Sequence, residues 1–153
     1  MIAQVTAGAR LEEVRSLFLE YAQSLGFTLC FQGFDEELRA LPGMYAPPRG
    51  RLLLAVEDAS PAGCVGLHQW NGEVAEMKRL YVPKAFRGRG LGRALTEAAL
   101  TEARSIGYRA VRLDTIPSLM QPAIALYREL GFREIAPYRE NPIPGALYLE
   151  LSL

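Results

Sequence analysis

The segment Arg87-Gly88-Arg89-Gly90-Leu91-Gly92-Arg93 separates two stretches of different periodicity. Before it, the stretch from Val74 to Val82 is typical of a β-strand. After it, apolar residues recur at helical spacing from Leu91 to Ile106 and end at Gly107. Glycines allow a tight turn, and the free N–H groups of a helix N-terminus attract anions. The segment therefore predicts a strand, a turn that binds phosphate, and a long helix.

The cations around this turn support a phosphate ligand. Residues 78–93 carry no acid and six basic side chains, namely Lys78, Arg79, Lys84, Arg87, Arg89 and Arg93. Guanidinium groups match phosphate oxygens in pairs, so we expect the whole run to line the pocket. A P-loop is excluded because Arg93-Ala94 follows Gly92, and a dinucleotide fingerprint would need glycine at position 93. A basic helix start without any ligand stays open as an alternative.

The rest of the chain predicts alternating strands and helices around this unit. We expect a weak first strand at 2–6, an amphipathic helix ending at Gly26, and a short helix from Asp35, as N-cap, to Leu41. A meander follows, with strands at 51–57, 64–70 and 74–82 joined by hairpin connections at 57–63 and 71–72. A strand at 110–115, a helix at 122–130 with Pro122 in its first turn, and a strand at 146–153 complete the prediction.

Length and composition predict a globular protein. The 153 residues, half of them hydrophobic and 22% charged, favour one domain over 1–153. The net charge of zero hides a split, because residues 1–76 carry five bases and ten acids, and residues 77–153 carry twelve bases and seven acids. One His and two Cys suggest neither a metal site nor a disulfide framework, and we expect Cys64 and His68 to be buried filler. We expect a cytoplasmic protein without nucleic-acid or membrane partners, and a homodimer is one assembly open to it.

Three motifs in order resemble the GCN5-related N-acetyltransferase (GNAT) superfamily over residues 50–153. Residues 87–92 match its Arg/Gln-x-x-Gly-x-Gly/Ala pyrophosphate loop. Upstream, Glu76-Met-Lys-Arg-Leu-Tyr-Val82 resembles its fourth strand, and downstream Ala123-Ile-Ala-Leu-Tyr-Arg-Glu-Leu-Gly-Phe132 resembles its last helix and turn. The region after residue 112 is similar to a bacterial branch whose acceptors are mostly unassigned.

The resemblance implies a fold and a cofactor site. The implied fold is α/β, with a central mixed sheet of six to seven strands flanked by about four helices, and the implied co-substrate is acetyl-CoA without a metal. The cofactor-binding residues would be Leu80, Tyr81, Val82, Arg87, Gly88, Arg89, Gly90, Leu91, Gly92 and Arg93, with backbone groups of Leu80 and Val82 on the pantetheine arm. The family often has Asn where this chain has Met120, so that contact is not carried over.

The family's chemistry, direct acetyl transfer to an amine, also names catalytic candidates. The family tyrosine that matches Tyr127 donates a hydrogen bond or a proton to the departing sulfur, although Tyr127 also suits core packing. An ordinary amine of pKa about 10.4 is mostly protonated at pH 7, so a base is needed. Glu76 and Asp114, acting directly or through water, are the two candidates. A third alternative is that neither of them is the base. Glu76 would otherwise pair with a cation and Asp114 would cap a loop.

The acceptor site is expected in the first half of the chain and in the loop 138–145. Its acids would attract a cationic amine, or form a solvated surface; they are Glu20, Asp35, Glu36, Glu37 and Glu140. Its apolar wall would come from Phe31, Phe34, Tyr45 and Trp70. Two other functions remain open: a noncatalytic acyl-CoA sensor on the same fold, and a nucleotide-binding regulator.

Overall fold

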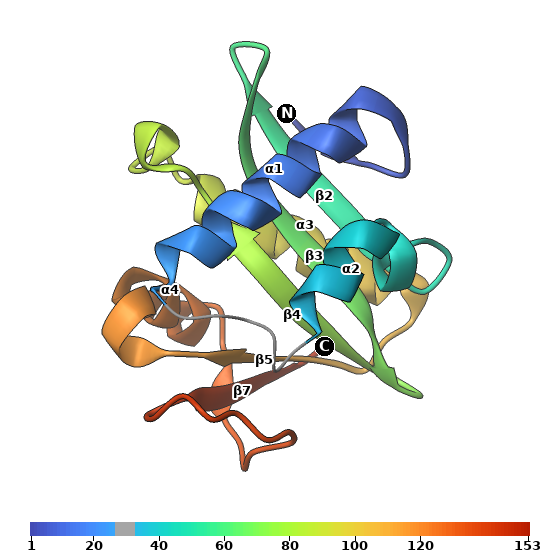
Figure 1. Cartoon of the computed structure of the whole chain (residues 1–153). Helices are drawn as coiled ribbons and strands as arrows, with labels where there is room; N and C mark the ends of the chain where they lie inside the picture. The colour runs from blue at the N-terminus through green and yellow to red at the C-terminus, as the bar shows by residue number, and fades with distance from the viewer. Residues whose placement is uncertain (27–32) are drawn as a thin grey trace.

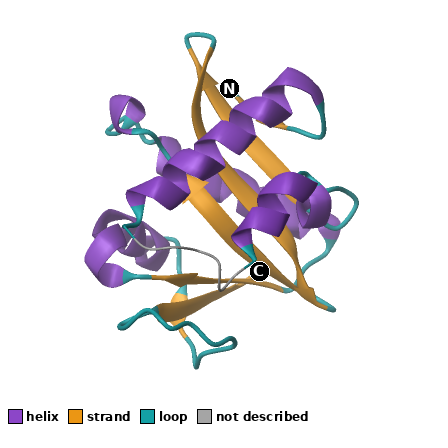
Figure 2. Ribbon diagram, in the orientation of Figure 1, coloured by secondary structure: helices purple, strands orange, loops and turns teal. Residues whose placement is uncertain are grey.

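The protein is built on a seven-stranded mixed sheet (Figures 1 and 2), seen in a computed structural model that describes residues 1–26 and 33–153, with only the backbone at 117–121. The strand order is β1-β2-β3-β4-β5-β7-β6. The strands are β1 (Ile2–Gln4), β2 (Arg51–Glu57), β3 (Ser60–Asn71), β4 (Val74–Tyr81), β5 (Ala110–Thr115), β6 (Arg133–Glu134) and β7 (Leu147–Ser152). The α-helices of the described residues are α1 (Gly8–Ser24), α2 (Phe34–Ala40), α3 (Leu91–Ile106) and α4 (Pro117–Glu129).

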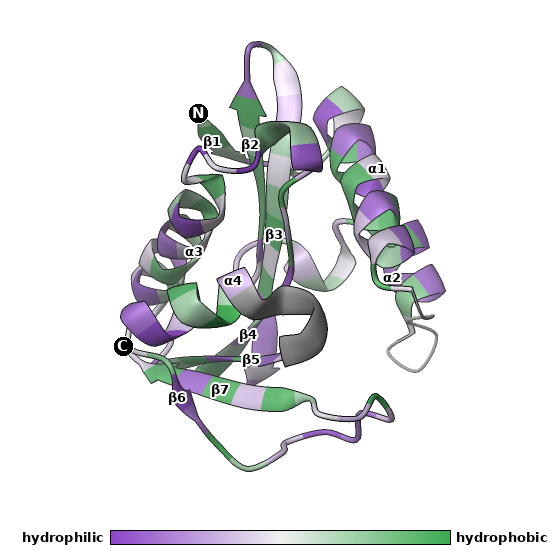
Figure 3. Cartoon of the chain, turned by 90° about the vertical axis from the view of Figure 1, so that its left-hand side faces the viewer, coloured by the Kyte–Doolittle hydropathy of each residue, from purple (hydrophilic) through white to green (hydrophobic). Residues whose placement is uncertain are grey.

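Helices cover both faces of the sheet. Figure 3 shows α1 and α2 on one side of the strands and α3 on the other. Two buried clusters correspond to these layers: α1 and α2 pack on Leu52, Leu54 and Cys64, whereas α3 and Tyr127 of α4 pack on the alternate residues of the same strands. The expected α/β fold, with its mixed sheet and flanking helices, is confirmed.

The sheet opens between β4 and β5. These strands run parallel, and they pair only from Val74 to Glu76 on β4 and from Ala110 to Arg112 on β5. Beyond this point β5 continues in antiparallel pairing with β7, through Asp114 and Thr115. The second half of β4, from Met77 to Tyr81, therefore has no partner on β5, and the two strands splay apart.

A bulge in β4 lies beside this opening. Cys64 of β3 pairs with Tyr81, and Gly66 pairs with Lys78, so one extra residue is accommodated on β4. Arg79 has a φ of 62°, the left-handed conformation expected of such an insertion. As a result, Lys78 and Arg79 both project toward the α1 and α2 side, and Leu80 and Val82 pack against the cluster beneath α3.

Several boundaries agree with the sequence prediction. The strands β2 and β5 begin and end at the predicted residues, and α3 spans the predicted range between Gly90 and Gly107. The parallel crossover from β4 through α3 to β5 is also confirmed.

Three local predictions were wrong. The hairpin between β2 and β3 is present, but its connection is a two-residue turn, because Asp58 and Ala59 both adopt positive φ and β3 begins at Ser60 rather than Cys64. Gly33, in left-handed conformation, is the N-cap of α2, which places Asp35 inside the first turn. The last helix begins at Pro117, which occupies the position predicted for Pro122, and Pro122 lies inside the helix.

Candidate active site

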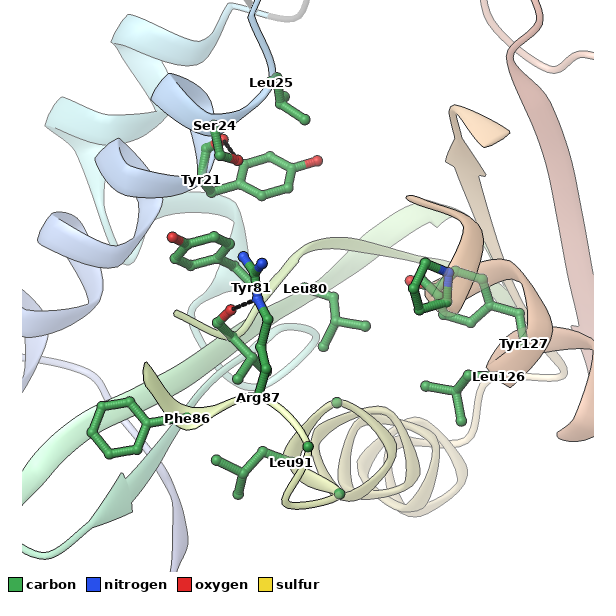
Figure 4. Close-up of a pocket in the computed structure, with 16 residues that line it drawn as sticks. Tyr21, Ser24, Leu25, Leu80, Tyr81, Phe86, Arg87, Leu91, Leu126 and Tyr127 are labelled. Carbon is green, nitrogen blue, oxygen red and sulfur yellow. Dashed lines mark hydrogen bonds between the residues drawn. The ribbon is translucent and has the colours of Figure 1, made fainter. Parts of the chain in front are cut away.

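A pocket of about 540 Å³ lies at the opening between β4 and β5 (Figure 4). The end of α1, the unpaired part of β4, the glycine turn and α4 all contribute to its wall. It is lined by Tyr21, Ser24, Leu25, Leu80, Tyr81, Val82, Phe86, Arg87, Gly88, Gly90, Leu91, Gly92, Pro122, Ala123, Leu126 and Tyr127. Most of the predicted cofactor residues thus face one cavity, which also adjoins Tyr127.

The glycine turn presents an uncapped helix N-terminus to this pocket. Gly88 and Gly90 have φ values of 82° and 78°, which favour glycine strongly. Gly90 is the N-cap of α3, and no side chain caps the helix there. The first backbone N–H groups of α3 are therefore available to an anion, and the helix dipole favours negative charge at the same place.

The arginines at the turn are already held by nearby groups. The Nε of Arg87 donates to the Val82 carbonyl at 2.9 Å, which ties the turn to the end of β4. Arg93 forms exposed ion pairs with Glu97 and Glu129, and Arg89 lies 3.7 Å from Glu57. These pairs are exposed and exchange readily, so they leave the guanidinium groups accessible to a phosphate.

The prediction that the whole run of cations serves the phosphate pocket was wrong. Lys78 and Arg79 are largely buried on the α1 and α2 side, away from the glycine turn. Arg79 forms a two-pronged pair with Glu37 of α2, at 2.9 Å for both nitrogen–oxygen distances, and lies over the ring of Phe34. The bulge that turns Arg79 toward α2 is the physical reason, and no local sequence pattern reveals its partner 42 residues away.

Two tyrosines face the pocket from opposite sides. Tyr127 reaches it from α4 and Tyr21 from α1, and the Tyr21 hydroxyl points toward the α4 side (Figure 4). Tyr127 also packs on Phe132, with 5.5 Å between ring centroids, so its core contacts and its exposure to the pocket coexist. Burial raises the pKa of Tyr127, and the phenol stays protonated across the physiological range. Tyr21 belongs to the amphipathic helix that the sequence predicts, and it was not predicted as a site residue.

Glu76 is fully buried in a polar network. His68 Nε2 lies 2.8 Å from one carboxylate oxygen, the Tyr138 hydroxyl donates to the other at 2.8 Å, and Arg139 donates to both. Burial acts to raise the pKa of Glu76, but the His68 hydrogen bond and the charges of Lys78 and Arg139 lower it to about 2. His68 is therefore buried, as expected, and it also holds Glu76 in place.

Asp114 lies on the other side of the opening and is less constrained. It is half-buried at the end of β5, and Asn141 donates to its carboxylate at 3.2 Å. Its charge contributes to raising the pKa of Tyr21 on α1 and of Tyr138 in the loop after β6. Asp114 thus lies among the tyrosines that surround the opening.

The apolar residues expected at the acceptor site lie in different parts of the molecule. Phe34 and Tyr45 are buried in the core, and the Tyr45 hydroxyl donates to Glu37 at 2.7 Å. Trp70 packs edge-on against Tyr138 with 4.9 Å between the ring centroids, so the loop 138–145 contacts β3. Phe31 and the Met120 side chain lie outside the described residues.

The acids expected to attract a cationic acceptor are mostly engaged elsewhere. Glu37 binds Arg79, Glu36 pairs with Arg39, and Glu20 accepts from the Tyr81 hydroxyl. Within residues 1–26 and 33–153, no group of three or more potential ligands could hold a metal ion. Over the same residues, none of the helices combines the length and apolar character needed to cross a membrane.

Comparisons with known proteins agree with this geometry. The acetyltransferase (GNAT) family model matches residues 11–132. An uncharacterized N-acetyltransferase of Schizosaccharomyces pombe is 38% identical over 99% of this chain and 94% of its own, and one of Dictyostelium discoideum is 30% identical over 97% of each. These relatives are eukaryotic, so the expected bacterial branch is not supported.

Solved structures share the fold. A GNAT acetyltransferase from Staphylococcus aureus superposes with a TM-score of 0.80 over 99% of both chains, at 18% identity. One from Elizabethkingia anophelis, with acetyl-CoA bound, gives a TM-score of 0.72 at 23% identity over 100% of this chain and 97% of its own. From the matched family model and the two full-length relatives, we conclude that this chain belongs to the GNAT family of acetyltransferases.

Proposed function

We propose that the protein transfers the acetyl group of acetyl-CoA to a primary amine. The observation that carries this proposal is the single pocket that joins an uncapped helix N-terminus, the unpaired half of β4 and a buried tyrosine. Each part suits one portion of acetyl-CoA: an anion site for the pyrophosphate, free strand backbone for the pantetheine arm, and a hydroxyl near the sulfur. The family and the acetyl-CoA complex of the E. anophelis protein support the same co-substrate.

The residues of the turn fit the phosphate portion. The N–H groups at the start of α3 and the guanidinium groups of Arg87, Arg89 and Arg93 would hold the pyrophosphate. The backbone of Leu80 and Val82 would pair with the amides of the pantetheine arm, because this part of β4 has no partner on β5. The apolar side chains of Leu91 and Leu126 would cover the arm.

Acetyl-CoA supplies an activated acetyl group, which leaves the sulfur as the acceptor nitrogen bonds to the carbonyl carbon. We propose that Tyr127 donates a proton to the departing sulfur. Burial raises the pKa of Tyr127 and keeps the hydroxyl protonated, as a group that donates a hydrogen bond or proton to the sulfur must be. Tyr21 lines the wall of the pocket opposite Tyr127, and its hydroxyl would help to orient the acceptor.

Between the two candidate bases, we propose Asp114, acting directly or through water. Glu76 accepts hydrogen bonds at both oxygens, and its pKa near 2 makes it a weak proton acceptor. Within the described part of the chain, Asp114 has a single neutral hydrogen-bond partner, Asn141, and it lies on the strand that flanks the opening. Glu76 would then be a positioning residue that fixes the loop carrying Tyr138 and Arg139 to β4.

Calorimetry and turnover test this proposal together. We expect acetyl-CoA to bind the wild type and Tyr127→Phe equally, and Tyr127→Phe to reduce kcat by about 10²- to 10⁴-fold. Arg104→Met, an exposed change at the far end of α3, serves as the control with unchanged turnover. If acetyl-CoA binds and no thiol is released with a broad panel of amines, the noncatalytic sensor is the better description. If acetyl-CoA does not bind, the proposal is wrong.

A further inference from the structure

Lys78 is a buried cation that has no hydrogen-bond or ion-pair partner among the described residues. Only 9% of the residue is exposed, and its ammonium forms no hydrogen bond or ion pair with any described residue. Among those residues, Arg139 Nε is the one side-chain nitrogen or oxygen that is both sealed from solvent and unpaired. The Lys78 nitrogen is therefore not sealed from solvent, and Lys78 lies on the part of β4 that has no partner on β5.

The charges around Lys78 are otherwise paired with one another. Its electrostatic neighbours are Arg79, Glu76, Arg139 and Glu37. Arg79 pairs with Glu37, and Arg139 pairs with Glu76, so these four groups balance. Lys78 is left with one uncompensated positive charge, at a place where burial makes such a charge costly. Burial, followed by the repulsion of Arg79, lowers the pKa of Lys78 to about 8.

One negative charge near the opening also lacks a cationic partner. The only hydrogen bond recorded for the Asp114 carboxylate comes from the neutral amide of Asn141, and it forms no ion pair with the described residues. Lys78 lies on the unpaired half of β4 and Asp114 on the facing part of β5. A cation on β4 and an anion on β5, each without an ion-pair partner among the described residues, thus lie on the two strands that flank the opening.

We propose that the acceptor is an amino acid in the broad sense, with a carboxylate as well as an amine, and that Lys78 binds the carboxylate. The inference rests on the proposed acetyl transfer and names its substrate class. The acceptor ammonium is attracted to Asp114, which takes its proton, while the carboxylate neutralises Lys78. The uncompensated charge of the free protein is thereby satisfied only in the complex.

An amine without a carboxylate would leave one charge of the site uncompensated. It would satisfy Asp114 but leave Lys78 buried and unpaired, and its own cation would add to the positive charge of Lys78 and Arg139. A carboxylate placed at Lys78 converts that repulsion into a charge-assisted hydrogen bond, which is about twice as strong as a neutral one. The unpaired Nε of Arg139 lies in the same charged group and would serve as a second donor after a small shift of the loop.

The first test uses acceptors in matched pairs. Each amino acid in a panel is compared with its carboxamide, and aspartate and glutamate also with asparagine and glutamine, so that only the carboxylate changes. We expect the wild type to prefer the acid in at least one pair, and Lys78→Met to lower that preference in kcat/KM at least tenfold, mainly through KM. Lys78→Arg should retain most of the preference, which separates charge recognition from proton transfer. Arg104→Met is the control and should leave the preference unchanged.

The second test needs no turnover. The chain contains only two lysines, Lys78 and Lys84, so the signals of ¹³C-labelled lysine are assigned with Lys84→Arg. In the presence of CoA, the amino acid should raise the Lys78 pKa by at least one unit, and its carboxamide should not.

The outcomes separate this inference from the proposed function. Acetyl transfer with equal efficiency to acids and carboxamides, or a preference that Lys78→Met leaves intact, would overturn the role of Lys78 and leave acetyl transfer standing. A Lys78 signal that no amino acid shifts would also overturn it. Failure to bind acetyl-CoA would instead remove the proposed function itself.

Discussion

The neighbouring charges Glu76 and Lys78 project from the same face of β4 yet differ in how they are compensated. Glu76 has three hydrogen-bonding partners from distant parts of the chain, and Lys78 has none among the described residues. A compensated buried carboxylate supports the fold, whereas an uncompensated buried ammonium opposes it. The two residues therefore lead to opposite predictions for stability.

Replacing Lys78 should stabilise the protein. We expect Lys78→Met to raise the free energy of unfolding at pH 7 by about 1 to 3 kcal/mol, because the unfavourable burial of the ammonium is removed. The folded-state pKa near 8 lies below the ordinary value of 10.5, so this group makes wild-type stability rise with pH between those values. Urea unfolding measures this effect: between pH 7 and pH 9.5, the free energy of unfolding should rise less in Lys78→Met than in the wild type. A destabilised variant would contradict the account.

Replacing Glu76 should have the reverse effect. Glu76→Gln leaves Arg139 buried without its carboxylate, and we expect a loss of about 3 to 5 kcal/mol in the free energy of unfolding. Glu73→Gln removes an exposed pair with Arg109 instead and should cost less than about 1 kcal/mol.

The acid sensitivity of Glu76→Gln provides a second measurement. The lowered pKa of Glu76 stabilises the wild type above pH 4.5, and this contribution is lost as the pH falls toward 2. Between pH 5 and pH 2.5, the unfolding temperature should therefore fall less steeply with pH for Glu76→Gln than for the wild type. Parallel slopes would show that Glu76 is not held as the structure indicates.

At the scale of elements, the start of α3 joins conformation to binding. Gly90→Ala forces a side chain into left-handed conformation at the N-cap, which costs about 1 to 2 kcal/mol and disturbs the N–H groups that face the pocket. We expect calorimetry to show weaker acetyl-CoA binding for this variant. Gly72→Ala introduces a comparable strain in the β3–β4 turn, where a Cβ meets nothing within 4 Å, and should leave binding unchanged. If Gly90→Ala and Gly72→Ala bound acetyl-CoA with equal affinity, the start of α3 would not be part of the binding site.

Elements that depend on local pattern were predictable. The strand β5 and the helix α3 begin and end as periodicity and glycine placement predict. The two-residue turn at Asp58 and Ala59 was not predicted, because these residue types do not indicate positive φ at two successive positions. Pro122 was assigned to the start of a helix because Pro117, the actual first residue, stands in a segment without helical periodicity.

The site was predictable only where its residues are close in sequence. The glycine turn and the end of β4 adjoin one another, and both line the pocket. The partners of Glu76 lie eight, 62 and 63 residues away, and Glu37 lies 42 residues from Arg79. Such pairs are set by the bulge and by the path of the loop after β6. Sequence could therefore name Glu76 as a candidate base but not its three hydrogen bonds.

At the scale of the whole molecule, acetyl-CoA should act as a bridge across the opening. The β4 and β5 strands share only three paired positions, so a ligand that contacts both β4 and α4 connects the two parts of the sheet. At a concentration 100-fold above its Kd, we expect acetyl-CoA to stabilise the protein by about 2.7 kcal/mol. Thermal shift and hydrogen exchange at residues 77–82 measure this effect. Equal stabilisation by ATP or NAD would favour a nucleotide-binding regulator.

The single extra residue in β4 also limits how the gene can change length. Up to Lys78, even-numbered side chains face α1 and α2; after Arg79, odd-numbered ones do. Inserting one codon between Arg79 and Leu80 would reverse the alternation that follows, sending Tyr81 into the layer beneath α3 and turning Leu80 to the polar side. Deleting Arg79 would remove the bulge and leave Glu37 buried without its cation. We therefore expect this short strand to accept very few insertions or deletions.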